Sequence, residues 1–206
     1  MKISVSKEDL LNGLQSVQNV VGTRSTLPIL SNVLLIATED RIELRATDLE
    51  VSIHASVPAT VEREGASTLP ARRIYGLVRE IEATEIEIEI SDKEIATVQA
   101  GGASYKLHGI GAEEFPPEAK FKESGKIKLQ QTKLREMLRK TSYAVSTDES
   151  RHTLNGINFI AEPERITLVA TDGRRLALVE EEIEGATKGQ FIMPSKTVGE
   201  LQRILQ

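Results

Sequence analysis

The chain has 206 residues, enough for one large domain or two small ones, and a formal net charge of −5 from 26 Lys and Arg against 31 Asp and Glu. This acidic balance makes the chain a poor candidate for wrapping nucleic acid by bulk charge, although a local basic face is compatible with it. Aromatic residues make up only 3% and Cys is absent, which argues against a base-stacking platform and excludes disulfides, cysteine–zinc sites and thiol catalysis.

Hydrophobic patterns divide the first 125 residues into short elements. Apolar residues at three- and four-residue spacing predict helices that bury one stripe, over residues 7–20 and 71–81. The other patterns predict antiparallel strands joined by tight turns, over residues 2–5, 33–38, 41–47, 51–61, 85–90, 95–100 and 104–110. The stretch from Gly111 to Gly125, which contains two prolines, is typical of a link to a following unit.

The sequence repeats itself at a constant offset of 124 residues. Residues 30–48 align with residues 154–172, and nine of these 19 positions are identical. The nine are Leu30, Ile36, Ala37, Arg41, Ile42, Leu44, Ala46, Thr47 and Asp48. The register holds without a gap from residue 3 to residue 82, so the chain contains a duplicated unit. Counterparts of residues 83–124 would lie beyond residue 206, and we therefore expect a fragment.

Each copy is expected to open with a short strand, at residues 2–5 and 126–129, and to continue into a helix. One unit then holds two helices packed on about eight antiparallel strands, an α+β fold class. We expect a first domain at residues 1–115, a linker at 116–125, and a second domain at 126–206 that is incomplete at its C-terminal end.

The charge is distributed unevenly among the predicted elements. The four helices, at residues 7–20, 71–81, 131–143 and 195–206, sum to −1, +2, +3 and +1, so they carry +5 and the rest of the chain carries −10. Lys and Arg are good helix formers and can simply fill solvated faces. Yet Arg72 recurs as Lys196 and Arg79 as Arg203, which favours one basic surface built from corresponding helices.

Motifs for catalysis are absent. The sequence has no Gly-x-x-x-x-Gly-Lys phosphate loop, no Gly-x-Ser-x-Gly elbow and no histidines at metal-ligand spacing, so we expect no cofactor, no metal and no catalytic residue. Asp48 and Asp172 each follow Ala-Thr at a strand end, where an aspartate more commonly caps a turn than performs acid–base chemistry. No membrane-length apolar run or secretory signal is present, and we expect a cytoplasmic protein.

Several motifs resemble those of the bacterial sliding clamp, the beta subunit of the replicative DNA polymerase III. They are TLPILSN at 26–32, ATDLE at 46–50, LPAR at 69–72, EFP at 114–116, LNG at 154–156 and ATDGRRL at 170–176. The resemblance implies a DNA clamp fold, with three clamp domains per subunit and two subunits that close a ring around double-stranded DNA. It also implies a non-catalytic processivity factor that docks the replicative polymerase, the clamp loader and other proteins carrying a clamp-binding motif.

The resemblance also implies functional residues. It places DNA contacts at Arg24 and Arg72, with Lys196 as the second-unit counterpart of Arg72. It places the homodimer contact at Tyr105 and Leu107, on an edge strand. The implied pocket for partner peptides consists of Arg151, Leu154, Thr171, Gly173, Arg174, Arg175 and Leu176.

The sequence differs from the family at some points, and two other classes of function are possible. Arg174 stands where the family often has His, and the third domain is missing, so this chain is not expected to close a ring by itself. The cations could be solvated surface residues and the leucines ordinary core. A DNA binder without a ring and an enzyme using Asp48 and Asp172 are the two alternative function classes.

Overall fold

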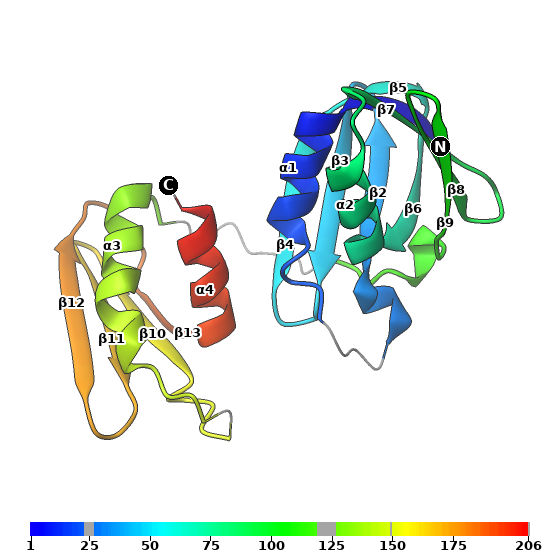
Figure 1. Ribbon diagram of the computed structural model, residues 1–206. Coiled ribbons are helices and arrows are strands. Elements are labelled where there is room, and N and C mark those ends of the chain that lie inside the picture. The colour runs from blue at the N-terminus through cyan, green and yellow to red at the C-terminus, as the bar shows by residue number, and fades with distance from the viewer. Residues whose placement is uncertain (23–26, 119–126, 149, 206) are drawn as a thin grey trace. The chain divides into compact units, whose positions relative to one another are not determined.

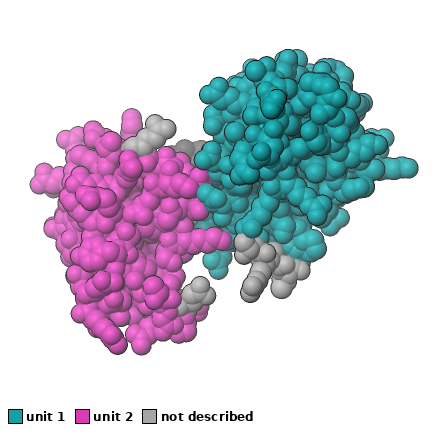
Figure 2. Space-filling model, in the orientation of Figure 1, with its two compact units in different colours: residues 1–118 teal, residues 119–206 magenta. Residues whose placement is uncertain are grey.

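The computed structural model describes residues 1–22, 27–118, 127–148 and 150–205 (Figure 1). The chain forms two compact units, Met1–Glu118 and Ala119–Gln206, coloured separately in Figure 2. No helix among the described residues is both long and apolar enough to cross a membrane.

Unit 1 consists of two antiparallel sheets and two helices. Its main elements are β1 (Lys2–Ser6), α1 (Lys7–Val17), β2 (Asn32–Thr38), β3 (Arg41–Thr47), β4 (Ser52–Pro58), β5 (Thr60–Arg63), β6 (Gly65–Pro70), α2 (Ala71–Glu80), β7 (Glu85–Ile90), β8 (Ile95–Ala100) and β9 (Ala103–His108). The sheets have the orders β5-β1-β7-β8-β9 and β4-β3-β2-β6. Helices α1 and α2 lie side by side over the second sheet (Figure 1).

Unit 2 contains one described sheet and two helices. Its main elements are α3 (Gln131–Thr141), β10 (Gly156–Glu162), β11 (Arg165–Thr171), β12 (Leu176–Glu182), β13 (Gly189–Pro194) and α4 (Ser195–Ile204). The strands follow the order β12-β11-β10-β13, and α3 packs against β11 and β12 (Figure 1).

The duplication predicted from the sequence is confirmed element by element. Each of these six unit-2 elements begins and ends 124 residues after its unit-1 counterpart; α3 corresponds to α1, α4 to α2, and β10, β11, β12 and β13 to β2, β3, β4 and β6. The sheet order is also the same, since β12-β11-β10-β13 maps onto β4-β3-β2-β6.

The same helical spacing buries the same positions in both units. Leu14 of α1 and its counterpart Leu138 of α3 are completely buried. Each lies in a hydrophobic core with strand residues, Leu14 with Leu44 and Leu138 with Leu168. The predicted α+β arrangement of helices on antiparallel strands is thus confirmed, with one core per unit.

Two strand predictions were wrong. Residues 51–61 were expected as one strand, but the structure has β4 and β5 in different sheets, because the chain changes sheets at Ala59, directly after Pro58. Residues 127–130 carry no strand, although a strand was expected at 126–129. In unit 1 the equivalent β1 pairs along its whole length with β7, whose counterpart would fall at residues 209–214, outside this sequence.

Candidate functional site

Basic residues occupy the second position of α2 and of α4. In α2 the buried residues include Ile74 and Val78, while Arg72 is exposed. In α4 Val198 is buried and Lys196 is exposed. The amphipathic pattern of each helix therefore directs one cation to solvent at the same position of both units. The third predicted DNA contact, Arg24, lies outside the described residues.

Several cations on the described helices are paired with carboxylates. The N···O distances are 2.8 Å for Arg79–Glu80, 2.7 Å for Lys140–Glu136 and 2.7 Å for Arg203–Glu200, and Lys133 pairs with Glu181 of β12. The Lys140 ammonium lowers the pKa of Glu136. The Arg79–Glu80 and Lys140–Glu136 pairs are largely exposed, so each is weak and exchangeable, and a phosphate can compete for these cations. Arg203 and Glu200 are less exposed.

The turn from β11 to β12 is built around one aspartate. Asp172 Oδ1 accepts hydrogen bonds from the amides of Arg174 (2.9 Å) and Arg175 (3.0 Å), and Oδ2 accepts one from Arg175 Nε (3.0 Å). These donors, the Arg174 and Arg175 amides first, lower the pKa of Asp172. The Thr171 hydroxyl donates to the Arg175 carbonyl and accepts from the Gly173 amide.

The corresponding turn in unit 1 has the same hydrogen bonds. Asp48 Oδ1 accepts from the amides of Glu50 and Val51, and the Thr47 hydroxyl donates to the Val51 carbonyl and accepts from the Leu49 amide. Both aspartates are therefore turn caps, as the Ala-Thr-Asp context indicated. The two residues on which the enzyme alternative rests thus have a structural role in their turns.

The residues predicted to form the peptide pocket lie in the Asp172 turn or beside it. Gly173 has a φ of +86°, and a Cβ placed on it would lie 3.9 Å from Arg151 Nη1, so these two residues are neighbours. Leu176 begins β12 with 62% of its surface exposed, which is incompatible with its being ordinary core. Leu154 is half-buried, and its amide donates to the Arg151 carbonyl at 2.8 Å.

A shallow hollow on the outer face of the β10–β13 sheet includes Thr171 but otherwise contains residues that sequence reasoning missed. They are Thr153, Gly156, Asn158, Val169, Gln190, Phe191 and Ile192. One pattern in the sequence could have found two of these residues. Asn158 and Val169 alternate with the buried residues of β10 and β11, which places their side chains on the face of the sheet opposite the core. Tyr143 was also missed; the Arg175 guanidinium lies over its ring, 5.7 Å from the centroid.

The predicted dimer contact lies on an edge strand. β9 is the last strand of the five-stranded sheet and pairs with β8 along one side, with Tyr105 opposite Val98 and Leu107 opposite Ala96. Tyr105 is 40% exposed, and Leu107 is half-buried against the unit-1 core. Such an edge offers unpaired backbone groups to another strand.

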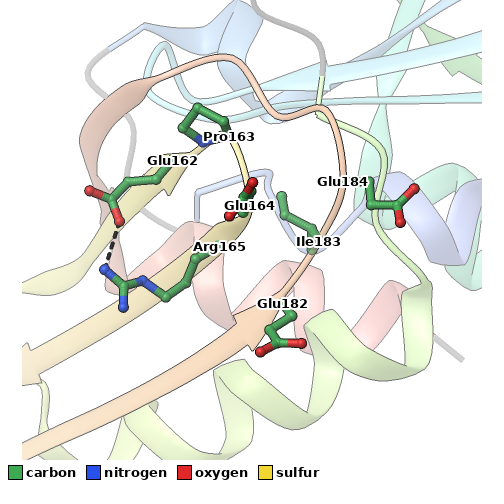
Figure 3. Close-up of a pocket in the computed structure, with 7 residues that line it drawn as sticks. All are labelled: Glu162, Pro163, Glu164, Arg165, Glu182, Ile183 and Glu184. Atoms are coloured by element: carbon green, nitrogen blue, oxygen red, sulfur yellow. Dashed lines mark hydrogen bonds and ion pairs between the residues drawn. The ribbon is translucent and has the colours of Figure 1, made fainter.

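A second hollow in unit 2 is acidic. Figure 3 shows it at the β10–β11 turn, lined by Pro163, Arg165 and Ile183 together with Glu162, Glu164, Glu182 and Glu184. Arg165 is held by Glu162, with an N···O distance of 2.8 Å. The hollow lies at the opposite end of β11 from the Asp172 turn, and its charge disfavours the binding of phosphate.

Comparison with protein families matches nearly the whole chain. Residues 1–119 match the model of the DNA polymerase III beta subunit N-terminal domain, and residues 128–206 match that of its central domain. The chain belongs to the DNA polymerase III beta subunit family. The predicted resemblance is thereby confirmed, and the repeated units correspond to two successive domains of this family.

Relatives of the family agree. The beta sliding clamp of Chlamydia trachomatis serovar D is 35% identical over 206 residues, covering 99% of this chain and 50% of the relative. The crystal structure of the DNA polymerase sliding clamp from Bacillus subtilis has a TM-score of 0.96 and 30% identity, covering 100% of this chain and 57% of that chain. The sliding clamp from Caulobacter crescentus gives a TM-score of 0.93 at 35% identity, covering 100% and 57%. This confirms the clamp fold, and the chain spans about half the length of the relatives it matches.

Proposed function

We propose that this chain supplies the first two domains of a bacterial DNA sliding clamp. The observation that carries the proposal is the match of both units, in order, to the N-terminal and central domains of the DNA polymerase III beta subunit. The clamp would encircle duplex DNA, act in the cytoplasm and keep the replicative polymerase on its template. This function requires no catalytic step, in keeping with two aspartates that serve as turn caps.

The DNA-facing role falls to the basic helix positions. Arg72, Lys196 and, by resemblance, Arg24 would contact phosphates rather than bases, which allows sliding without regard to sequence. The proposal is supported by the exposure of Arg72 and Lys196 at equivalent helix positions. Because the helices carry +5 within a chain of net charge −5, DNA would be attracted locally while the acidic remainder stays away from it.

The Asp172 turn would form the docking pocket for clamp-binding peptides of the polymerase, the clamp loader and other partners. Leu154 and Leu176 would supply apolar surface. Gly173 would leave room for a ligand side chain, because Arg151 is the one described residue, apart from its chain neighbours, that has an atom within 4 Å of the missing Cβ. Arg174 and Arg175 add positive charge at the rim. The proposed homodimer would use the β9 edge with Tyr105 and Leu107.

The decisive experiment measures topological retention with the full-length gene product. The protein is loaded by its clamp loader and ATP onto a nicked circular duplex, and gel filtration follows before and after linearisation of the circle. We expect co-elution with the circle and loss on linearisation, because a closed ring has no strong equilibrium contact with DNA. Arg72→Ala combined with Lys196→Ala should lower loading without changing the dependence on circularity.

Equal retention on circular and linear DNA would contradict the ring and support direct binding by the basic helices, with a steep dependence on salt. If the protein is retained on neither form while the loader is active on another clamp, both the ring and direct DNA binding by the basic helices are contradicted.

A further inference from the structure

The last ten residues of unit 1 cross the outer face of the β4-β3-β2-β6 sheet. The crossing starts beside β6, where Thr68 and Ile110 exchange backbone hydrogen bonds of 3.1 and 3.2 Å. It ends with Glu118 at Arg45 of β3 and His54 of β4. Arg45 lies between the buried residues of β3, so its side chain is on the face opposite the core.

An ionic cluster holds the end of this crossing segment. Glu118 Oε2 accepts a hydrogen bond from Arg45 Nη1 at 3.1 Å, and Glu118 Oε1 lies 3.6 Å from His54 Nδ1. Arg45 Nη2 also donates to Glu43 Oε2 at 2.6 Å. The Arg45 side chain is 28% exposed, so water and salt screen its attraction to Glu118 less than they screen an open surface pair.

The duplicated unit shows that the fold does not require this cluster. The counterparts of Arg45 and His54, 124 residues later, are Val169 and Leu178. The strand pairing is the same, with Arg45 opposite His54 and Val169 opposite Leu178. The ionic cluster is therefore specific to unit 1, where a described chain segment crosses the sheet and ends at Arg45 and His54.

We propose that Glu118 is an ionic latch that fixes the point at which the polypeptide leaves unit 1. Glu118 is the last residue of this unit. With the latch closed, the connection to unit 2 starts over β3 and β4. With the latch open, the Ile110 hydrogen bonds are the last backbone hydrogen bonds between the described part of this segment and the sheet, and residues 111–118 join the connection to unit 2. Those eight residues lengthen its reach by up to about 28 Å at ~3.5 Å per residue.

The test is amide hydrogen exchange by NMR on the whole 206-residue chain. The reporters are the amides of Glu114 and Phe115, which donate to Gly111 and Ala112 within the crossing segment, and the amide of Ile110 is the internal reference for an intact sheet edge. Glu118→Ala should raise exchange of the two reporters about two- to fivefold, the range expected for a partly shielded ion pair. Exchange at Ile110 should not change.

Three comparisons make the result decisive. Arg45→Val, which introduces the unit-2 residue, should raise exchange equally, and the double variant should add nothing further. Molar salt should bring the unmodified chain towards the Glu118→Ala value. Glu89→Ala breaks the exposed ion pair with Arg63, outside this segment, and should not change exchange at the two reporters. Unchanged exchange in Glu118→Ala, an equal effect of Glu89→Ala, or additive effects of the latch variants would overturn the proposal.

Discussion

At the scale of single residues, the two Thr-Asp turns show how a short motif can fix local geometry. The Thr and Asp side chains make matching hydrogen bonds in both units. The residue of the turn that has a positive φ nevertheless differs, since it is Leu49 in unit 1 and Gly173 in unit 2. For Leu49, with φ of +78°, this conformation costs about 1–2 kcal/mol. The motif therefore imposes the turn even without glycine.

The lowered pKa of Asp172 makes unit 2 less stable in acid. A carboxyl whose pKa is lower in the folded than in the unfolded state contributes its full stabilisation above the ordinary value, here 3.8. This contribution falls as the pH drops through the folded value. Asp172→Asn keeps an acceptor but cannot titrate, so the stability difference between wild type and variant should shrink as the pH falls below 3.8. Urea unfolding across this range measures it; a constant difference would contradict the assignment.

The exposed leucine beside this turn provides the residue-scale test of the docking pocket. Leu176→Ala should weaken binding of a clamp-binding peptide of the replicative polymerase about fivefold or more, as expected for an apolar anchor. Leu49→Ala is the matched control, because Leu49 is 61% exposed, Leu176 is 62% exposed, and Leu49 lies in the equivalent turn of unit 1. Isothermal calorimetry compares the two; equal affinities for all three proteins would remove Leu176 from the pocket.

At the scale of elements, the paired helices α1 and α3 meet their sheets differently. A Cβ on Gly13 of α1 would lie 2.5 Å from Val57 Cγ2 and 2.8 Å from Leu44 Cδ1. The counterpart position in α3 is Met137, which is 2% exposed. Gly13 thus permits close approach of α1 to β3 and β4, whereas a long flexible side chain fills the same position in unit 2.

Two glycine substitutions separate packing from helix propensity. Gly13→Ala should destabilise unit 1 by about 1–2 kcal/mol, because overpacking outweighs the gain in helix propensity. At Gly76, in α2, an added Cβ would meet no described heavy atom within 4 Å outside the local helix backbone, so Gly76→Ala should stabilise the unit by about 0.5–1 kcal/mol. Urea unfolding followed by circular dichroism gives both values. A stabilised Gly13→Ala variant would show that the close contact relaxes at no cost.

At the scale of the whole molecule, charge is separated between helices and the rest of the chain. The helices carry +5 and the remainder −10, yet several helical cations have carboxylate partners, such as Arg79 with Glu80. Weak, exchangeable pairs of this kind suit the proposed clamp role, in which DNA is held without a fixed position. The retention experiment on circular DNA belongs to this scale, because it tests a closed assembly rather than any single contact.

The duplication and most of the helices and strands followed from the sequence alone, and the quoted motifs carried the resemblance to the family. Buried apolar residues recur at helix and strand periods, and one offset of 124 residues relates both copies, so the elements and the duplication can be recognised without knowing which distant residues meet. The Asp48 and Asp172 caps were predictable for the same reason, since their partners lie within four residues.

Which distant residues meet became known from the three-dimensional structure. The break at Pro58 places β5 beside β1, in a different sheet from β4, because pairing partners come from remote parts of the chain. Arg45 and Glu118 are 73 residues apart, and neither shows its partner in the local pattern. Hydrophobic periodicity indicates which face of a helix or strand is buried. Ion pairs and sheet edges depend instead on how the helices and strands are arranged in space, and the local sequence pattern does not contain that arrangement.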